Sequence, residues 1–263
     1  MLSKNKIKFI NSLKKKKHRT GQGLFIAEGT KLVLELLDNG VDASMLCATT
    51  HWYNNHTIFS GAKVTDQLEV TEKDLQKIST LKTPPEVLGV FNIPEHPFDI
   101  RDLSGKLSMV LDRINDPGNL GTIIRLADWF GIEHLICSPD SVDLYNPKTV
   151  QSTMGSIARV KVSYRDLTDV LKTASQQMGF NIYGSFLEGE NLYTTELTRE
   201  GVIVMGSESH GISPELHPFI NRHIYIPAYP PGKAPTAESL NVSMATGIIC
   251  SEFRRREWGG YSG

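Results

Sequence analysis

The sequence contains few cysteines and no long apolar segment. Its 263 residues include three cysteines that lie far apart and form no C-x-x-C pair: Cys47, Cys137 and Cys250. Such a set argues against a disulfide framework and a cysteine-rich zinc site, and favours free thiols in a reducing compartment. Neither a run of 18 apolar residues nor a signal-peptide core is present, so we expect a cytoplasmic protein without a membrane span.

Several common catalytic motifs are missing as well. No G-x-G-x-x-G follows a predicted strand, and the sequence contains no G-x-x-x-x-G-K-[ST], H-E-x-x-H or G-x-S-x-G. A nucleotide-binding oxidoreductase would need the first of these fingerprints. With 40% hydrophobic and 22% charged residues, the composition is that of a globular protein of one large or two ordinary domains.

Acidic residues are absent from the first 20 positions, which contain eight lysines and arginines, although the formal net charge of the whole chain is −1. A basic arm on an otherwise acidic protein indicates a polyanionic partner. The alternative is a solvated, lysine-rich helix face, because an apolar stripe predicts a helix over 5–17 that ends before Gly23.

The rest of the chain divides into two regions. Residues 24–95 predict a small α/β unit, with strands at 24–29, 45–49 and 87–93 and helices at 30–37 and 71–79. From residue 107, strands at 107–112, 134–138, 160–164, 181–187, 201–208 and 222–228 are interspersed with helices at 119–131, 146–158, 166–179 and 239–256. Such alternation predicts a parallel sheet covered on both faces, with ligands bound beyond the carboxyl ends of its strands.

Three loops at that edge contain candidate functional residues. Asn119 follows Pro117-Gly118, where a helix cap is expected. Arg125 lies in an otherwise apolar helix, so it must reach solvent, form an ion pair or face a ligand. Glu208 lies between Gly206 and Gly211, which would also suit a simple turn.

The third loop leads into the last helix. Ser239 and Asn241 place polar groups at its start, where ligands often bind. The simpler alternative is a helix cap followed by a small-residue packing face. His210 in the preceding loop is expected to be a surface histidine.

Taken together and in this order, residues 115–125, 206–211 and 226–242 resemble the SpoU (TrmH-type) family of RNA ribose 2′-O-methyltransferases, in the SPOUT class. Residues 26–29 and 84–91 look like the RNA-binding domain found at the N-terminus of that family. The resemblance implies an α/β fold: an RNA-binding domain at 1–97, a linker at 98–106, and a parallel-sheet methyltransferase domain with a trefoil knot at 107–263. It also implies a homodimer that uses S-adenosylmethionine and no metal.

The resemblance also suggests roles for individual residues. Five polar residues fall on the family's active-site positions: Arg125, Asn119, Glu208, Ser239 and Asn241. The cofactor contacts are expected at Gly206, Ile226, Pro227 and Leu240. The stretch between Pro227 and Ser239 is longer than the family's usual link, so contacts within 228–237 are not assigned. If RNA is the polyanion, the basic arm predicts phosphate contacts at Lys14, Lys15, Lys16, Lys17 and Arg19.

The predicted reaction is methylation of a ribose 2′-hydroxyl of ribosomal or transfer RNA, and the two-domain layout favours ribosomal RNA by analogy. Arg125 has been described as the base in this family, but a guanidinium has a pKa above about 12. We therefore expect Arg125 to act as a fixed cation beside the developing alkoxide, with Asn119 and Glu208 orienting it. The alternative is an RNA-binding protein on the same scaffold without catalytic activity.

Overall fold

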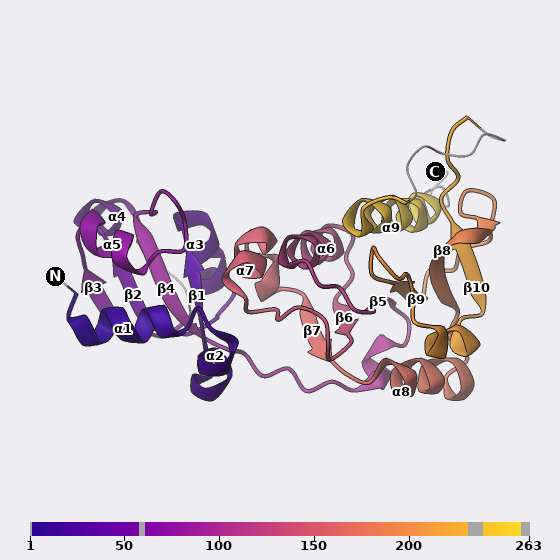
Figure 1. Cartoon of the computed structure of the whole chain (residues 1–263), viewed down its shortest axis with the longest axis horizontal. Helices are drawn as coiled ribbons and strands as arrows, with labels where there is room; N and C mark the ends of the chain where they lie inside the picture. Colours follow the sequence, from indigo (N-terminus) through magenta and orange to yellow (C-terminus); the bar gives the residue numbers. More distant parts are fainter. Residues whose placement is uncertain (1, 58–60, 231–238, 259–263) are drawn as a thin grey trace. The chain divides into compact units, whose positions relative to one another are not determined.

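The computed structural model describes residues 2–57, 61–230 and 239–258. It contains two compact units, Met1–Glu95 with Asp143–Arg159, and His96–Val142 with Val160–Gly263 (Figure 1). Residues 143–159, expected in the second domain, therefore belong to the first unit. The reason lies in long-range contacts, since the ring of Tyr145 packs on Phe25 with centroids 4.8 Å apart and Asp143 pairs with Arg19.

The first unit is built on a four-stranded sheet in the order β1-β4-β2-β3. β4 is antiparallel to both β1 and β2, whereas β3 is parallel to β2. The strands are β1 (Leu24–Glu28), β2 (Ala43–Ala48), β3 (Val64–Glu69) and β4 (Val87–Asn92). The helices are α1 (Lys4–Ser12), α2 (Lys16–Gln22), α3 (Thr30–Asp38), α4 (Thr50–Asn55), α5 (Glu72–Ile78) and α7 (Pro147–Thr153), with a 3-10 turn η2 (Ser156–Ala158).

The second unit contains a six-stranded sheet in the order β10-β8-β9-β5-β6-β7, and every neighbouring pair is parallel, as predicted. Its strands are β5 (Leu107–Leu111), β6 (His134–Cys137), β7 (Lys161–Tyr164), β8 (Ile182–Asn191), β9 (Gly201–Met205) and β10 (Arg222–Tyr225). Its helical elements are α6 (Pro117–Trp129), α8 (Leu167–Lys172), α9 (Val242–Trp258), η1 (Ile100–Leu103), η3 (Thr173–Gln177) and η4 (Pro214–Phe219).

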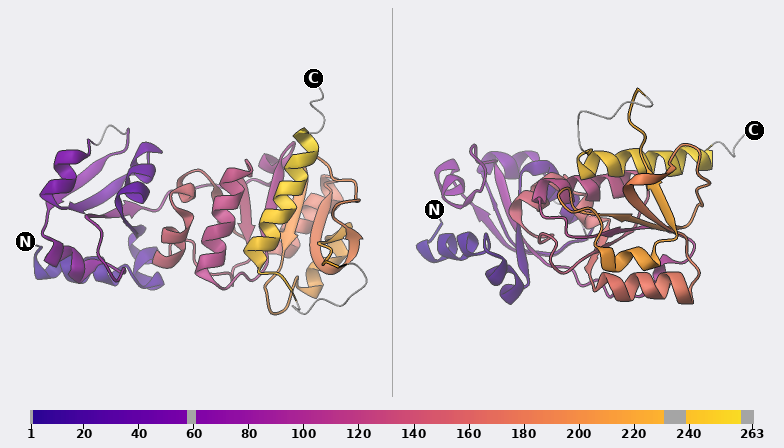
Figure 2. Two further views of the ribbon diagram at one scale, coloured as in Figure 1. Left: turned by 90° about the horizontal axis from the view of Figure 1, so that it is seen from above. Right: turned by 45° about the vertical axis from the view of Figure 1, so that its right-hand side comes forward.

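Helices cover both faces of this parallel sheet. Figure 2 shows α6 and α9 side by side on one face, with α8 on the opposite face. The central strands β5 and β9 are buried along their whole length, as continuous apolar runs such as GVIVM predict. None of the described helices is long and apolar enough to cross a membrane.

Local structure differs from the prediction at several places. The helix expected over 5–17 is two helices, because the chain turns at residues 13–15 and α2 then ends at Gly23, whose φ is +64°. The helix expected over 146–158 is shorter, and consists of α7 followed by the 3-10 turn η2. The helix expected over 166–179 consists of α8 followed by η3, which is one turn of π-helix. The sequence patterns did not predict α4 or β3.

Candidate active site

The site lies at the carboxyl edge of the parallel sheet, where the chain leaves β5 and β9 and where α9 begins. The first loop leads into α6, which is capped by Asp116 rather than by Asn119 as expected. The Asp116 carboxylate accepts a hydrogen bond from the backbone N–H of Asn119 at 2.9 Å, and Pro117 occupies the first helical position. The side chain of Asn119 is therefore available for contacts with the other loops.

The second loop carries Glu208 on a closed turn. Ser207 and Gly211 exchange two backbone hydrogen bonds of 3.1 and 2.9 Å, and Gly211 has a φ of +64°. A Cβ on Gly206 would lie 2.1 Å from the carbonyl carbon of Gly211, so position 206 admits only glycine in this turn. The requirement for glycine thus arises from the loop itself, before any cofactor is considered.

The third segment supplies Asn241, which caps α9. Its Oδ1 accepts hydrogen bonds from the backbone N–H of Ser243 at 3.1 Å and from the Ser243 hydroxyl at 2.6 Å. This capping directs its amide nitrogen towards the other two loops.

Three of the five predicted active-site residues meet directly. The Asn119 amide donates a hydrogen bond to Glu208 Oε1. Asn241 Nδ2 donates to Asn119 Oδ1 at 3.1 Å and to the same Glu208 oxygen at 3.3 Å. The polar cluster Asn119–Glu208–Asn241 therefore links all three loops, which are far apart in the sequence.

Arg125 and Ser239 lie outside this cluster. Both side chains are exposed, and neither forms a hydrogen bond or ion pair with another described residue. Asn119 and Glu208 bond one another, and neither bonds Arg125 within the described residues, so the expectation that they orient Arg125 stays a prediction. Positions six residues apart on a helix lie on faces about 120° apart, which explains why Arg125 does not reach the cluster from α6.

The predicted cofactor residues surround the same edge. Ile226 and Pro227 follow β10 and are half-buried, and Leu240 is 49% exposed just before α9. Within the described part of the chain, the backbone N–H groups of Gly206, Ile226 and Leu240 have no hydrogen-bond partner. Apolar surface beside unused backbone donors suits an adenosine group. Residues 231–237, part of the stretch where cofactor contacts were left unassigned, lie outside the described residues.

No described group of three His, Cys, Asp or Glu side chains is arranged to hold a metal ion. The three cysteines are free and buried. Burial raises the pKa of each thiol to about 12, so none is a thiolate at neutral pH.

The residues predicted to contact RNA differ in their exposure to solvent. Lys15, Lys16 and Lys17 are exposed at the start of α2. Lys14 is half-buried and donates to the Ser79 carbonyl at 3.0 Å, and desolvation lowers its pKa. Arg19 is 3% exposed. It pairs with Asp143 and donates to the Leu13 carbonyl at 2.9 Å, so it has a structural role instead of the predicted phosphate contact.

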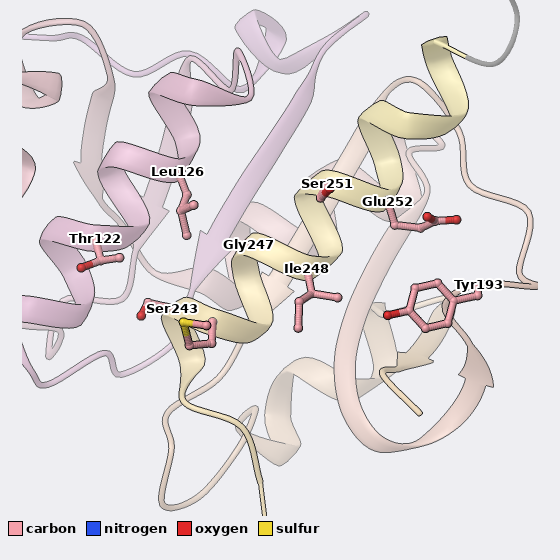
Figure 3. A pocket seen from close by; sticks show the side chains of 9 residues that line it. Thr122, Leu126, Tyr193, Ser243, Gly247, Ile248, Ser251 and Glu252 are labelled. Atoms are coloured by element: carbon pink, nitrogen blue, oxygen red, sulfur yellow. The ribbon is translucent and has the colours of Figure 1, made fainter. Parts of the chain in front are cut away.

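A groove of about 410 Å³ runs between α6 and α9 (Figure 3). Leu126 of α6 and Gly247 and Ile248 of α9 are among the residues that line it, and Tyr193 lines it from the other side of α9. Met244 is 62% exposed in the groove and Trp129, at the end of α6, is 84% exposed. Sequence analysis missed this surface, although a tryptophan on the polar side of α6 was a signal for it.

Comparison with known proteins gives the family. The model of the SpoU rRNA Methylase family matches residues 106–251, and the model of an MRM3-like substrate binding domain matches residues 4–89. A 23S rRNA (guanosine(2553)-2′-O)-methyltransferase of Bacillus subtilis is 28% identical over 95% of this chain and 96% of its own.

Solved structures agree with these matches. A protein of Porphyromonas gingivalis assigned to the TrmH family of RNA methyltransferases is 38% identical and has a TM-score of 0.85, covering 97% of this chain and 99% of the other. An AdoMet-bound rRNA methyltransferase of Sinorhizobium meliloti is 32% identical, with a TM-score of 0.82 over 97% and 96%. The chain belongs to the SpoU (TrmH) family, as the three loops predicted.

Proposed function

We propose that this protein methylates a ribose 2′-hydroxyl group of ribosomal RNA. By family it is an S-adenosylmethionine-dependent RNA (ribose-2′-O) methyltransferase. The observation that carries the proposal is the Asn119–Glu208–Asn241 cluster at the carboxyl edge of a parallel sheet. The choice of ribosomal RNA is supported by relatives that are named as rRNA methyltransferases, including those of Bacillus subtilis and Neisseria meningitidis.

The chemistry is an in-line displacement in which S-adenosylmethionine supplies an activated methyl group. The protein must hold the ribose hydroxyl in line and stabilise the charge that develops on its oxygen. In our proposal the cluster and Ser239 align the ribose with the cofactor, which Gly206, Ile226, Pro227 and Leu240 hold. Because Arg125 does not reach the cluster of its own chain, we propose that it acts across the dimer described below. There it places a permanent positive charge beside the developing alkoxide and the adjacent phosphate, to which its planar guanidinium can form two hydrogen bonds. The hydroxyl proton passes to water or to phosphate.

The two parts of the chain have different roles in this proposal. Residues 1–97 bind the RNA substrate, 98–106 form the linker, and 107–263 carry the methyltransferase, except that residues 143–159 pack with the first unit. The match of residues 4–89 to a substrate binding domain supports the first role, and the exposed Lys15–Lys17 run supplies charge for phosphate contacts. The trefoil knot and the cytoplasmic location stay predictions, the latter supported by three free cysteines.

We further propose that the protein acts as a homodimer. Trp129, Met244 and the groove between α6 and α9 form an exposed apolar surface of a kind that is common at interfaces and costly to leave in water. Arg125 lies one turn before Trp129 on α6 and shares its exposed face. A second copy bound to this face would therefore contact Arg125 or lie beside it, which links assembly to catalysis.

The dimer can be tested with a charge placed at its expected centre. Trp129→Glu should convert the protein to a monomer in light scattering and lower methyl transfer. Leu187→Glu is the matched control, because Leu187 is 74% exposed on β8 and is not among the residues that line this groove. A dimeric Trp129→Glu protein would exclude this face as the interface.

The reaction is tested by incubating the protein with tritiated S-adenosylmethionine and either ribosomal or transfer RNA. We expect label in ribosomal RNA, at a nucleotide that loses the label when its ribose lacks the 2′-hydroxyl. Label only in transfer RNA would correct the substrate. S-adenosylmethionine binding or RNA binding without any transfer would favour the inactive RNA-binding alternative, against which the presence of all five polar residues argues.

A further inference from the structure

Asp112 is a buried carboxylate that none of the predicted site roles includes. It follows β5 directly and is 3% exposed. Its Oδ2 accepts two hydrogen bonds of 2.7 Å from Ser213, one from the backbone N–H and one from the hydroxyl. A buried charge must be compensated by such contacts, so this pair is a strong constraint on where Ser213 lies.

Ser213 occupies the cap position of η4 but does not cap it. A serine at this position normally bonds a backbone N–H of the helix that follows, whereas the hydroxyl of Ser213 makes no such bond and is directed to Asp112. The hydroxyl therefore connects two loops at the expense of a local cap.

The Asp112–Ser213 pair joins the same two loops that the active-site cluster joins. Asp112 begins the loop that carries Asn119, and Ser213 ends the loop that carries Glu208. The loops are thus bonded twice, at their bases through Asp112 and Ser213 and at their tips through Asn119 and Glu208. Glu208 itself is exposed, so burial does not hold it in place.

The backbone beside Asp112 is strained. Arg113 has a φ of +54°, which is uncommon for a residue with a side chain, and its N–H donates to the Ser138 hydroxyl at 2.8 Å. Its Nε is buried without a hydrogen-bond partner among the described residues and lies 3.6 Å from Asp112 Oδ1. A strained backbone held in this way is typical of places where a structure maintains a functional geometry.

We propose that Asp112 and Ser213 are positioning residues for methyl transfer, because they fix the distance between the two loops and so hold Glu208 against Asn119. The proposal rests on the proposed function of the cluster. Displacing a reacting group by about 1 Å can cost about 100-fold in rate. We therefore expect Ser213→Ala, which removes one of the two bonds to Asp112, to lower the single-turnover rate about 10-fold.

The test is a double-mutant cycle with Glu208. If Ser213 acts through Glu208, Ser213→Ala should lower the rate about 10-fold in the wild-type background and less than about 2-fold in the Glu208→Ala background. Asp112→Asn should behave in the same way. Thr153→Val is the matched control, because the buried Thr153 hydroxyl bonds the Val150 carbonyl within α7, and its removal should leave the rate unchanged.

Hydrogen exchange provides a readout that needs no RNA. Ser213→Ala should speed exchange of the backbone amides in 206–212, including the bonded amides of Ser207 and Gly211, while Thr153→Val should not. If the wild type methylates no RNA, the proposed function fails, but this measurement still decides whether the pair positions the loop. Equal rate losses in both backgrounds, unchanged exchange, or a loss of rate that only follows the loss of folded protein would overturn the proposal.

Discussion

Arg19 forms a buried ion pair with Asp143, a residue 124 positions later in the chain. The pair joins the N-terminal basic arm to the segment that begins at Asp143, and both belong to the first unit. Removing one partner leaves the other charge buried without compensation, which typically costs about 3–5 kcal/mol. Because the side chain of Asp143 is 18% exposed and can be partly hydrated, we expect the lower end of this range. Arg19→Ala should reduce the free energy of unfolding by about 3 kcal/mol, measured by urea unfolding. Lys16→Ala is the control and should leave stability unchanged, since Lys16 is exposed.

The exposed lysines are expected to contribute affinity for RNA. Replacing Lys15, Lys16 and Lys17 by alanine should weaken binding and reduce the slope of log affinity against log salt by about 2, because each phosphate contact releases about 0.7 of a counterion from a single strand. Filter binding at several salt concentrations measures both the affinity for RNA and its dependence on salt. An unchanged slope would identify the run as a solvated helix face.

Gly206 is expected to be intolerant of any side chain. In Gly206→Ala the new Cβ would collide with the backbone of Gly211, so the turn must open and move Glu208 away from Asn119. We expect a folded protein with weaker S-adenosylmethionine binding by calorimetry and a lower transfer rate. Gly105→Ala is a useful control, because its Cβ would meet nothing within 4 Å although its φ of +72° adds some strain. Normal cofactor affinity in Gly206→Ala would show that the turn does not shape the pocket.

Arg125 is expected to affect the chemical step more than cofactor affinity. The cofactor is already a cation, whereas the alkoxide forms only as the methyl group moves, so a positive charge there stabilises the transition state selectively. Arg125→Ala should lower the single-turnover rate by about 10²–10³. Arg125→Lys should also lose most activity, because lysine lacks the planar fork. A fully active Arg125→Ala enzyme would contradict the assignment, and a loss of cofactor binding alone would make Arg125 a structural residue.

His134 should make the stability of the second unit depend on pH. It is buried at the start of β6, and its pKa lies below the usual value because of desolvation and the nearby positive charges of Lys106 and Lys161. The unfolded chain therefore binds a proton at a higher pH than the folded chain does. This contribution to stability is complete above about pH 6.5 and is lost as the pH falls towards the folded pKa. The free energy of unfolding can be measured in urea at pH 8 and at pH 5.5. The difference between the two values should be smaller for His134→Gln than for the wild type.

Local sequence patterns predicted most of the second unit correctly. The apolar runs of β5 and β9 are central strands, and the motifs around Asn119, Glu208 and Asn241 identified the family and the edge of the sheet. The elements that were missed have weak local signals. β3 is largely exposed and reads VTDQLE, so it is a strand mainly because β2 pairs with it, and α4 has only six residues.

The sequence by itself determined the alternation of strands and helices, the three polar loops and the basic arm, because periodicity, caps and charge runs are encoded within a few neighbouring residues. Only the tertiary structure decided what each residue contacts. Arg19 is buried against Asp143 while Lys16 remains exposed, and Asp112 bonds Ser213 101 positions away. Such pairs depend on the order of strands in each sheet and on which loops that order brings to one edge, and no local pattern contains that information.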